Sequence, residues 1–337
     1  MKFDAIIIGP SVIDLFIKTK QSKIIKDSDF TKNDGLAFPL GEKLTSNVFD
    51  TKTGGGGLNV ANTFSNFGYK TKLITIVGKD NQKEIITKKI SSLRNLSNNT
   101  IVIDDKKSTS TSCILLANNS ERTIITSHNS CNKNLKIKKS LLQNLSTRLI
   151  FTSSLYGKKE NWNAILSHKK KNPKTLWCAN PNIQDLSYLK SNLNILKYID
   201  CFFVNQEEAS FLSGIDYKNE QKIFKFIDKY VKGICIMTKG TKGLSLSDNK
   251  HIYSCGIYKH AKEIDHTGAG DAFASGFSMM YLKTKEIEYS IKFGLANAAN
   301  VVEKIGANTN ILTPTSFNSK TWKKYFNKLK ITKTKLC

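Results

Sequence analysis

The sequence lacks any long hydrophobic run. None of its apolar stretches approaches the roughly 18 consecutive apolar residues that a membrane-spanning helix requires. The N-terminal run at residues 5–9 is too short for a signal peptide and is flanked by Asp4 and Asp14. We therefore expect a cytoplasmic protein that does not act at a membrane. Its 337 residues, 39% of them hydrophobic, are enough to bury a large core.

Cysteine pairs with Cys-x-x-Cys spacing are also missing. The 7 cysteines are scattered along the chain. Most of them lie in apolar surroundings, where a reduced thiol packs as a small hydrophobic group. This distribution indicates neither a zinc site nor a disulfide framework.

Acidic residues are outnumbered by basic ones, 27 to 52, which gives a formal net charge of +25. The lysines are spread along the whole chain and accompanied by many asparagines, so we expect no nucleic-acid partner. The same charge would help to steer a polyanionic nucleotide toward the protein.

Near the C-terminus, one helical face carries Trp322, Tyr325, Phe326 and Leu329, with lysines opposite. This pattern predicts a basic helix within residues 313–337 that packs on the body rather than on a membrane.

Residues 264–271, Ile-Asp-His-Thr-Gly-Ala-Gly-Asp, carry the most informative motif, and apolar residues at helical spacing follow it. Gly268, Ala269 and Gly270 have almost no side chain, so their backbone N–H groups can face one concavity at the positive end of a helix dipole. Such a concavity binds anions. Asp271 beside it is suited to accept a proton from a hydroxyl, which suggests phosphoryl transfer to an alcohol. From these residues alone, a tight turn with an acidic first turn remains the alternative.

A second glycine-rich segment occupies residues 54–57 and precedes a helix predicted to end at Gly68. A Rossmann dinucleotide loop would need a preceding buried strand, but residues 50–53 are polar. Asn59 is either the N-cap of this helix or an amide that binds hydroxyl groups beside the glycines. Asp14 lies in the predicted loop after a buried strand at residues 3–9, where it could reach a substrate hydroxyl or simply be solvated.

Repeated strand–helix units predict a parallel sheet covered by helices on both faces. The predicted strands are residues 3–9, 72–77, 149–153, 175–179, 201–204 and 234–238. Asn205 and Glu208 follow one of them and suit water-mediated Mg²⁺ binding, with helix capping by Asn205 as the alternative. Thr238 and Gly240 end the next strand, in a glycine turn that could line a nucleotide site. Residues 15–52 and 109–126 are predicted to form short β segments outside the main sheet.

With these residues assembled, the chain resembles the ribokinase-like (PfkB) carbohydrate kinase family over about residues 3–312. The resemblance rests on Gly-Gly-x-Gly-x-Asn at residues 54–59, Asn-x-x-Glu at 205–208 and Asp-x-Thr-Gly-Ala-Gly-Asp at 265–271, in this order. It implies transfer of the γ-phosphoryl group of ATP to a sugar or nucleoside hydroxyl. It also implies a Rossmann-like α/β body, residues 1–312, with a small β-sheet lid from residues 15–52 and 109–126, through which subunits could pair.

The resemblance further implies a role for each matched position. Asp271 would be the catalytic base, and Gly268, Ala269 and Gly270 would form the anion hole that holds the transferring phosphoryl group. The remaining implied roles are sugar-hydroxyl contacts for Asp14, Gly55 and Asn59; nucleotide contacts for Asn205, Thr238, Gly240 and Asn297; a water-mediated Mg²⁺ contact for Glu208; and a monovalent-cation site, such as one for K⁺, at Asp265, Thr267 and Gly306.

Three departures from the family pattern bear on the substrate. His266 stands where members more often carry Thr, Pro, Ser or Val, and we expect little effect because this side chain need not touch substrate. Gly56 stands where ribokinases usually have lysine, and residues 152–157 lack the glutamate that ribokinases carry. The sequence therefore predicts an ATP-dependent sugar kinase acting on a primary hydroxyl, not ribose in particular. An adenosine-type nucleoside kinase and a catalytically idle regulator that binds nucleotide or sugar remain as alternatives.

Overall fold

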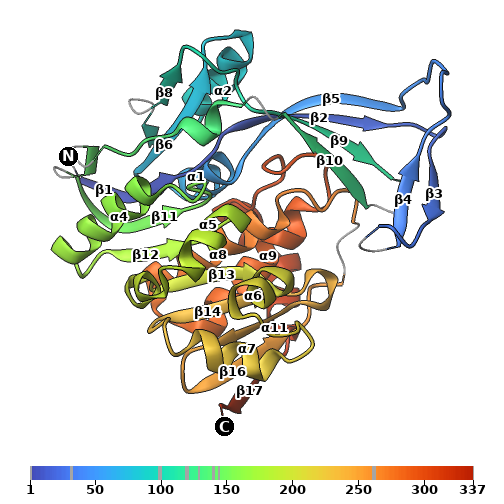
Figure 1. Ribbon diagram of the computed structural model, residues 1–337. Helices are drawn as coiled ribbons and strands as arrows, with labels where there is room; N and C mark the ends of the chain where they lie inside the picture. Colours follow the sequence, from blue (N-terminus) through green and yellow to red (C-terminus); the bar gives the residue numbers. More distant parts are fainter. Residues whose placement is uncertain are drawn as a thin grey trace.

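A large, mostly parallel sheet forms the centre of the molecule. The computed structural model describes residues 2–30, 33–97, 101–117, 121–127, 130–138, 141–142, 145–259 and 263–336. Within these residues the strand order is β17-β16-β15-β14-β13-β12-β11-β1-β6-β7, and β8 pairs with β6 (Figure 1). The bounds are β1 (Lys2–Ile8), β6 (Thr71–Gly78), β7 (Leu96–Ser97), β8 (Ile101–Asp104), β11 (Ser146–Thr152), β12 (Leu176–Ala179), β13 (Cys201–Asn205), β14 (Ile234–Thr238), β15 (Leu244–Ser247), β16 (His251–Cys255) and β17 (Thr332–Lys335).

The pairing from β7 through to β14 is parallel, which confirms the prediction from the repeated strand–helix units. Strands β15, β16 and β17 instead extend the sheet in antiparallel fashion from β14. Only residues 239–243, which include the short helix η3 (Gly240–Lys242), separate β14 from β15. This connection is too short for a crossover helix, so the chain has to return as a hairpin.

Helices cover both faces of the sheet, because side chains of the central strands alternate between two cores. In β1, Ala5 and Ile7 lie in one core, and Phe3, Ile6 and Ile8 lie in the other. Burying each of these isoleucines contributes about 1.5–3 kcal/mol to folding. The first core contains residues of α1 (Gly56–Asn66), α2 (Asn81–Ser92), α8 (Ala269–Thr284) and α9 (Ile287–Val301). The second contains residues of η1 (Cys131–Asn134), α4 (Lys159–Lys171), α5 (Ile183–Lys190), η2 (Leu193–Tyr198), α6 (Gln206–Ser213) and α7 (Glu220–Ile227).

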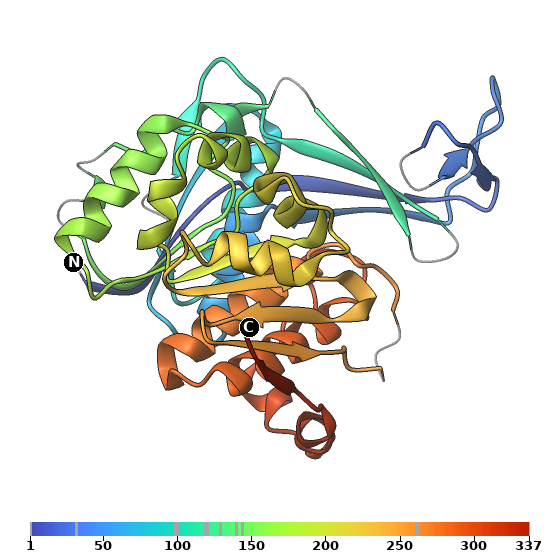
Figure 2. The same cartoon turned by 60° about the horizontal axis from the view of Figure 1, so that its bottom comes forward.

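A separate four-stranded sheet, called the lid here, extends away from the body (Figure 2). Its strand order is β10 (Arg122–Thr126), β9 (Thr111–Leu116), β2 (Val12–Lys18) and β5 (Val48–Gly54). The small hairpin of β3 (Lys23–Lys26) and β4 (Asp34–Ala37) lies at its far end (Figure 1). These strands come largely from the two segments predicted to lie outside the main sheet. Residues 118–120, between β9 and β10, fall outside the described residues.

The lid corrects the predicted position of Asp14. This residue lies on β2, where it pairs in register with Ser112 of β9, and not in a loop. Phe16, two residues further along the same face, packs with Ile114 of the lid and Ile305 of the body. The lid strand therefore continues over the body and carries Asp14 with it.

The C-terminal segment packs on the body through α10 (Pro314–Phe317) and α11 (Lys320–Lys328). The Trp322 side chain is buried in the first core, in edge-to-face contact with Tyr258 at a centroid distance of 5.4 Å. Strand β17, which the sequence did not predict, then adds to the edge of the large sheet. Among the described residues, no helix is both long and apolar enough to cross a membrane.

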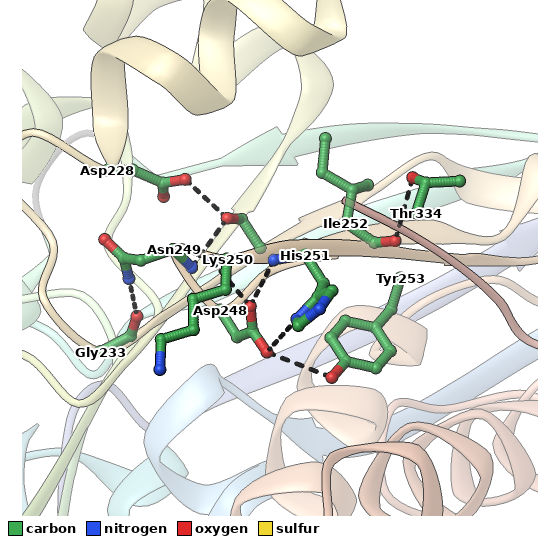
Figure 3. Close-up of polar contacts among 10 residues, drawn as sticks. Asp228, Gly233, Asp248, Asn249, Lys250, His251, Ile252, Tyr253 and Thr334 are labelled. Carbon is green, nitrogen blue, oxygen red and sulfur yellow. Dashed lines mark hydrogen bonds and ion pairs between the residues drawn. The ribbon is translucent and has the colours of Figure 1, made fainter. Parts of the chain in front are cut away.

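The turn between β15 and β16 is closed by polar contacts within the protein (Figure 3). Asp248 accepts hydrogen bonds from the backbone N–H of His251 and from the hydroxyl of Tyr253, at 2.6 and 3.1 Å. Thr334 of β17 donates to the backbone carbonyl of Ile252 in β16. These contacts hold the antiparallel edge of the sheet together, so we assign this cluster a structural role.

Candidate active site

The N-terminus of α8 opens onto a cavity of about 530 Å³, and Ala269 and Gly270 line it. Gly268 is the N-cap, with a left-handed φ of 80°, and a Cβ there would collide with Ala307. Glycine is therefore required to make this turn. No described side chain caps α8. Ala269 N donates to the His266 carbonyl oxygen at 3.2 Å, whereas the Gly270 N–H remains available to an anion.

Asp271 lies in the first turn of α8 and is held by two amides. Asn59 Nδ2 donates to Asp271 Oδ2 at 2.8 Å, and Asn180 Nδ2 donates to Oδ1 at 3.3 Å. Burial raises the pKa of Asp271, and the two amide donors partly offset that effect. The carboxylate is thus paired, with one oxygen held more closely than the other.

Asn180 was not predicted as a site residue from the sequence, although its position after a predicted strand could have indicated it. It directly follows β12, at the carboxyl end of a parallel strand, which is where open α/β sheets bind ligands. The prediction named the residues after β13 and β14 but not this one.

Asn59 lies inside α1, whose N-cap is Gly55, so the N-cap interpretation of Asn59 is wrong. Its amide instead points at Asp271. Gly55 has a φ of 91°, and a Cβ there would lie 2.6 Å from the Pro10 carbonyl oxygen. A Cβ at Gly56 would collide with Ser153 Oγ and lie 3.3 Å from Asp271 Oδ1. Gly55 is needed for its positive φ and for the nearby Pro10 backbone, and Gly56 leaves room for the side chains of Ser153 and Asp271.

Asp14 reaches the same region from the lid. Its side chain is only 5% exposed. Burial is the main cause that raises the pKa of Asp14 to about 7, the Ser112 hydroxyl lowers it, and the nearby carboxylates of Asp265 and Asp271 raise it further. A Cβ at Gly54 would collide with the Asp14 carboxylate. The structure therefore brings Asp14, Asn59 and Asp271 into one neighbourhood at the junction of lid and body.

The cavity itself has a polar rim and an apolar wall. Thr238 and Gly240, both predicted to line a nucleotide site, do line it. Its apolar lining is suited to a flat ring and consists of Leu244, Ile257, Tyr258, Phe273, Leu295, Ala298, Ala299 and Val302. Gly270 adds a backbone N–H group to this lining, which suits a ligand that carries both a ring and a phosphate chain.

Asn297 does not reach this cavity, contrary to the role implied for it. Its side chain is fully buried. Its Nδ2 donates to the Ala272 carbonyl at 2.8 Å, and its Oδ1 accepts from Leu312 N at 3.1 Å. This amide joins α9 to α8 and to the following loop, and the neighbouring Ala298 and Ala299 line the cavity in its place.

Asn205 and Glu208 form a capping box at the start of α6. Glu208 N donates to Asn205 Oδ1 at 2.8 Å, and Asn205 N donates to Glu208 Oε2 at 2.7 Å. The capping interpretation thus holds for Asn205. Both Asn205 and Glu207 also line the cavity. Burial raises the pKa of Glu208. No group of at least three His, Cys, Asp or Glu side chains that could hold a metal ion occurs in the described part of the chain.

The structure brings Asp265, Thr267 and Gly306 together. Asp265 Oδ1 accepts from Thr267 N at 2.9 Å and from Thr267 Oγ1 at 2.6 Å, and Oδ2 accepts from Gly306 N at 3.0 Å. The carboxylate is fully buried. These hydrogen bonds fix the segment before α8 to the loop after α9, so Asp265 has a clear structural role.

Two ionisable side chains line the cavity although the sequence did not assign them a role there. Arg122 of β10 lines the cavity from the lid, and its buried Nε has no hydrogen-bond partner among the described residues. His266 also lines the cavity, where its Nε2 lies 3.0 Å from Glu263 Oε2. The expectation that a change of residue at position 266 has little effect stays a prediction, although the side chain lies at the cavity. No local pattern reveals the position of Arg122, because it depends on how the lid folds over the body.

Comparison with known proteins agrees with this architecture. The chain is 28% identical over 291 residues to a ribokinase of Haemophilus influenzae, which covers 81% of this chain and 88% of that protein. It is 24% identical over 284 residues to a cytidine kinase of Thermococcus kodakarensis, covering 81% and 94%. The structure of Arabidopsis thaliana ribokinase complexed with ribose and ATP superposes with a TM-score of 0.72 at 19% identity, covering 97% of this chain and 99% of that one.

The expected fold, a Rossmann-like α/β body with a small β-sheet lid, is thereby confirmed as ribokinase-like. The family model described as pfkB family carbohydrate kinase matches residues 29–314, which is most of the chain. Because this match covers well over half of the chain and includes the residues around Asp271, the chain belongs to the pfkB family of carbohydrate kinases.

Proposed function

We propose that this protein transfers the γ-phosphoryl group of ATP to a primary hydroxyl of a sugar. The observation that carries the proposal is the position of Asp271, which lies in the first turn of α8 beside an uncapped helix N-terminus that opens onto the cavity. A base next to an anion site is the minimum that phosphoryl transfer to an alcohol requires.

In this mechanism Asp271 Oδ1 takes the proton of the acceptor hydroxyl as its oxygen attacks the γ-phosphorus in line. Oδ1 is the better candidate because its contact with Asn180 is 3.3 Å, longer than the 2.8 Å contact of Oδ2 with Asn59. The N–H groups of residues 268–270 stabilise the transferring phosphoryl group. Positioning and charge stabilisation supply most of the acceleration.

Arg122 supplies positive charge from the lid. The cavity lining also contains Lys239, but its ammonium group already binds Glu220 and Ser245 at 3.1 and 2.7 Å. Arg122 Nε has no such partner among the described residues. We therefore assign Arg122 to the phosphate chain of the nucleotide, where closure of the lid would also exclude water.

Magnesium and a monovalent cation fit the site in different ways. Mg²⁺ commonly binds to substrate phosphates, water and one or two carboxylates. Glu208 could contribute through water, although one of its oxygens caps α6. The metal would neutralise phosphate charge when bound. For K⁺, the segment of Asp265, Thr267 and Gly306 provides a buried carboxylate near α8. This carboxylate accepts hydrogen bonds from the Thr267 N–H, the Thr267 hydroxyl and the Gly306 N–H.

Asp14 is expected to make acceptor binding depend on pH. Because its pKa is raised to about 7, its carboxylate is protonated below that pH and loses its ability to accept hydrogen bonds from two hydroxyls. The KM for the acceptor should therefore rise as the pH falls through about 7, while the KM for ATP changes less. Asp14→Asn should raise the acceptor KM and remove this pH dependence. A variant that keeps the wild-type profile would show that another group is responsible.

A nucleoside acceptor is the second candidate, favoured by the likeness to a cytidine kinase and by the absence of both ribokinase-type residues noted above. Phosphorylation should be tested with ribose, fructose, fructose phosphates, 2-keto-3-deoxygluconate, adenosine and cytidine. A sugar kinase leaves the nucleosides unchanged, whereas a nucleoside kinase leaves the free sugars unchanged. Tight ATP binding without product from any acceptor would favour the idle regulator.

We also propose that two copies pair through the outer face of the lid. Phe49 and Ile125 lie on this face and are 71% and 55% exposed. Such an apolar face is suited to a second copy of itself. Sedimentation should give a dimer that Phe49→Lys weakens; a wild-type monomer at all concentrations would contradict this proposal.

A further inference from the structure

Asn308 lies behind the proposed base and is connected to it through Asn59. Its side chain is 5% exposed. Asn308 Nδ2 donates to Asn59 Oδ1 and to the Thr53 carbonyl oxygen, both at 2.9 Å. Asn59 Nδ2 in turn donates to Asp271 Oδ2 at 2.8 Å. Three side chains from different parts of the sequence thus form one continuous chain of hydrogen bonds.

This chain has a fixed direction. The Thr53 carbonyl can only accept, so the Asn308 atom that faces it has to be the NH₂ group. That group presents its other N–H to Asn59, which therefore turns its oxygen toward Asn308 and its NH₂ toward Asp271. Asp271 Oδ2 is consequently held as an acceptor at 2.8 Å, whereas Oδ1 has only the longer 3.3 Å contact with Asn180.

The backbone around Asn308 is anchored on two sides. Asn62 Nδ2 of α1 donates to the Asn308 carbonyl at 3.1 Å, and Gly306 N donates to Asp265 at 3.0 Å. Asn308 therefore cannot follow Asn59 easily if that side chain moves. An amide held this firmly can impose an orientation on its neighbour.

We propose that Asn308 is a positioning residue that sets the orientation of the Asn59 amide and thereby directs the proton of the acceptor to Asp271 Oδ1. The inference rests on the proposed function of Asp271 as the base. Charged groups near this pair include the carboxylates of Asp14, on the lid, and Asp265, before α8, and the Lys52 side chain beside Gly306, whose ammonium group pairs with Asp50. They lie outside the Asn308–Asn59 pair, so changes at Asn308 leave them in place.

The test compares Asn308→Ala and Asn308→Asp with Asn310→Ala. Asn310 lies in the same loop, and its amide binds the carbonyl of Asn300, not the active site. ATP turnover should be measured with ribose, adenosine and cytidine and with water alone. Asn308→Ala should lower kcat by up to about tenfold with little change in the KM for ATP, which is the scale of one lost hydrogen bond between neutral amides. Asn308→Asp should lower kcat further. The new carboxylate would accept a hydrogen bond from the NH₂ group of Asn59, which turns the Asn59 oxygen toward Asp271.

A double-mutant cycle separates positioning from general damage to the fold. In an Asn59→Ala background, Asn308→Ala should have almost no further effect, because the link is already broken. Equal losses in Asn308→Ala and Asn310→Ala, or additive losses with Asn59→Ala, would overturn the inference while leaving the proposed base intact. Normal turnover by Asp271→Asn would instead overturn the proposed function.

Discussion

Replacing Asp271 with asparagine is expected to lower kcat at least about a hundredfold, which is the low end of the scale for removing a general base. The amide has nearly the same shape as the carboxylate, so α8 and its anion site should remain. The asparagine amide cannot accept the proton of the acceptor hydroxyl, so the chemical step should slow. ATP should still bind in the cavity. Steady-state kinetics and calorimetric titration with ATP measure the two effects separately.

Glu288→Gln is the matched control for this change. Glu288 is also an acidic residue in the first turn of a helix, α9, but it is exposed and does not line the cavity. Its replacement should leave kcat unchanged. Near-normal turnover by Asp271→Asn would remove the role assigned to this carboxylate, and equal losses in both variants would point to helix stability instead.

Replacing Arg122 with alanine is expected to lower kcat by about tenfold to a hundredfold, because hydrogen bonds between charged groups contribute about 1.5–3 kcal/mol. Arg122→Lys should restore only part of the loss, since an ammonium group cannot reproduce the geometry of a guanidinium group that binds two phosphate oxygens. The KM for the acceptor should change little. The measurement is kcat and both KM values for the two variants.

Arg94→Ala controls for the loss of a positive charge alone. Arg94 is exposed and lies outside the cavity lining. If Arg94→Ala and Arg122→Ala lower the rate equally, long-range attraction of ATP explains both effects. If Arg122→Ala is fully active, the lid supplies no phosphate contact.

Local motifs made the centre of the site predictable. Gly268 and the glycines around Gly55 are needed for a left-handed turn or for close approaches, and glycine runs of this kind are visible in a short stretch of sequence. The parallel strands were predictable for a similar reason, because buried strands between helical segments form apolar runs. The glycine runs and the apolar strands are visible locally, although the residues that these glycines approach, such as Ala307 and Pro10, are distant in the sequence.

The rest of the site depends on contacts between distant segments. Contacts made only in the folded protein give roles to Asn180, Arg122 and Asn308. These residues lie directly after β12, on the lid and in the loop after α9, and no local spacing in the sequence predicts that these segments come together. The implied nucleotide contact of Asn297 failed for the same reason, because its orientation toward Ala272 is set by the packing of α9 on α8. Asn205 presented two plausible roles, and only the folded chain showed the capping geometry.

The measurement that tests the central claim most directly is phosphorus NMR and mass spectrometry of reactions that contain the protein, ATP, Mg²⁺ and K⁺ with each acceptor of the panel. The account predicts that one class of acceptor gains a phosphate on a primary hydroxyl while an equal amount of ADP forms. Production of ADP without a phosphorylated acceptor, or phosphate found on a secondary hydroxyl, would contradict it.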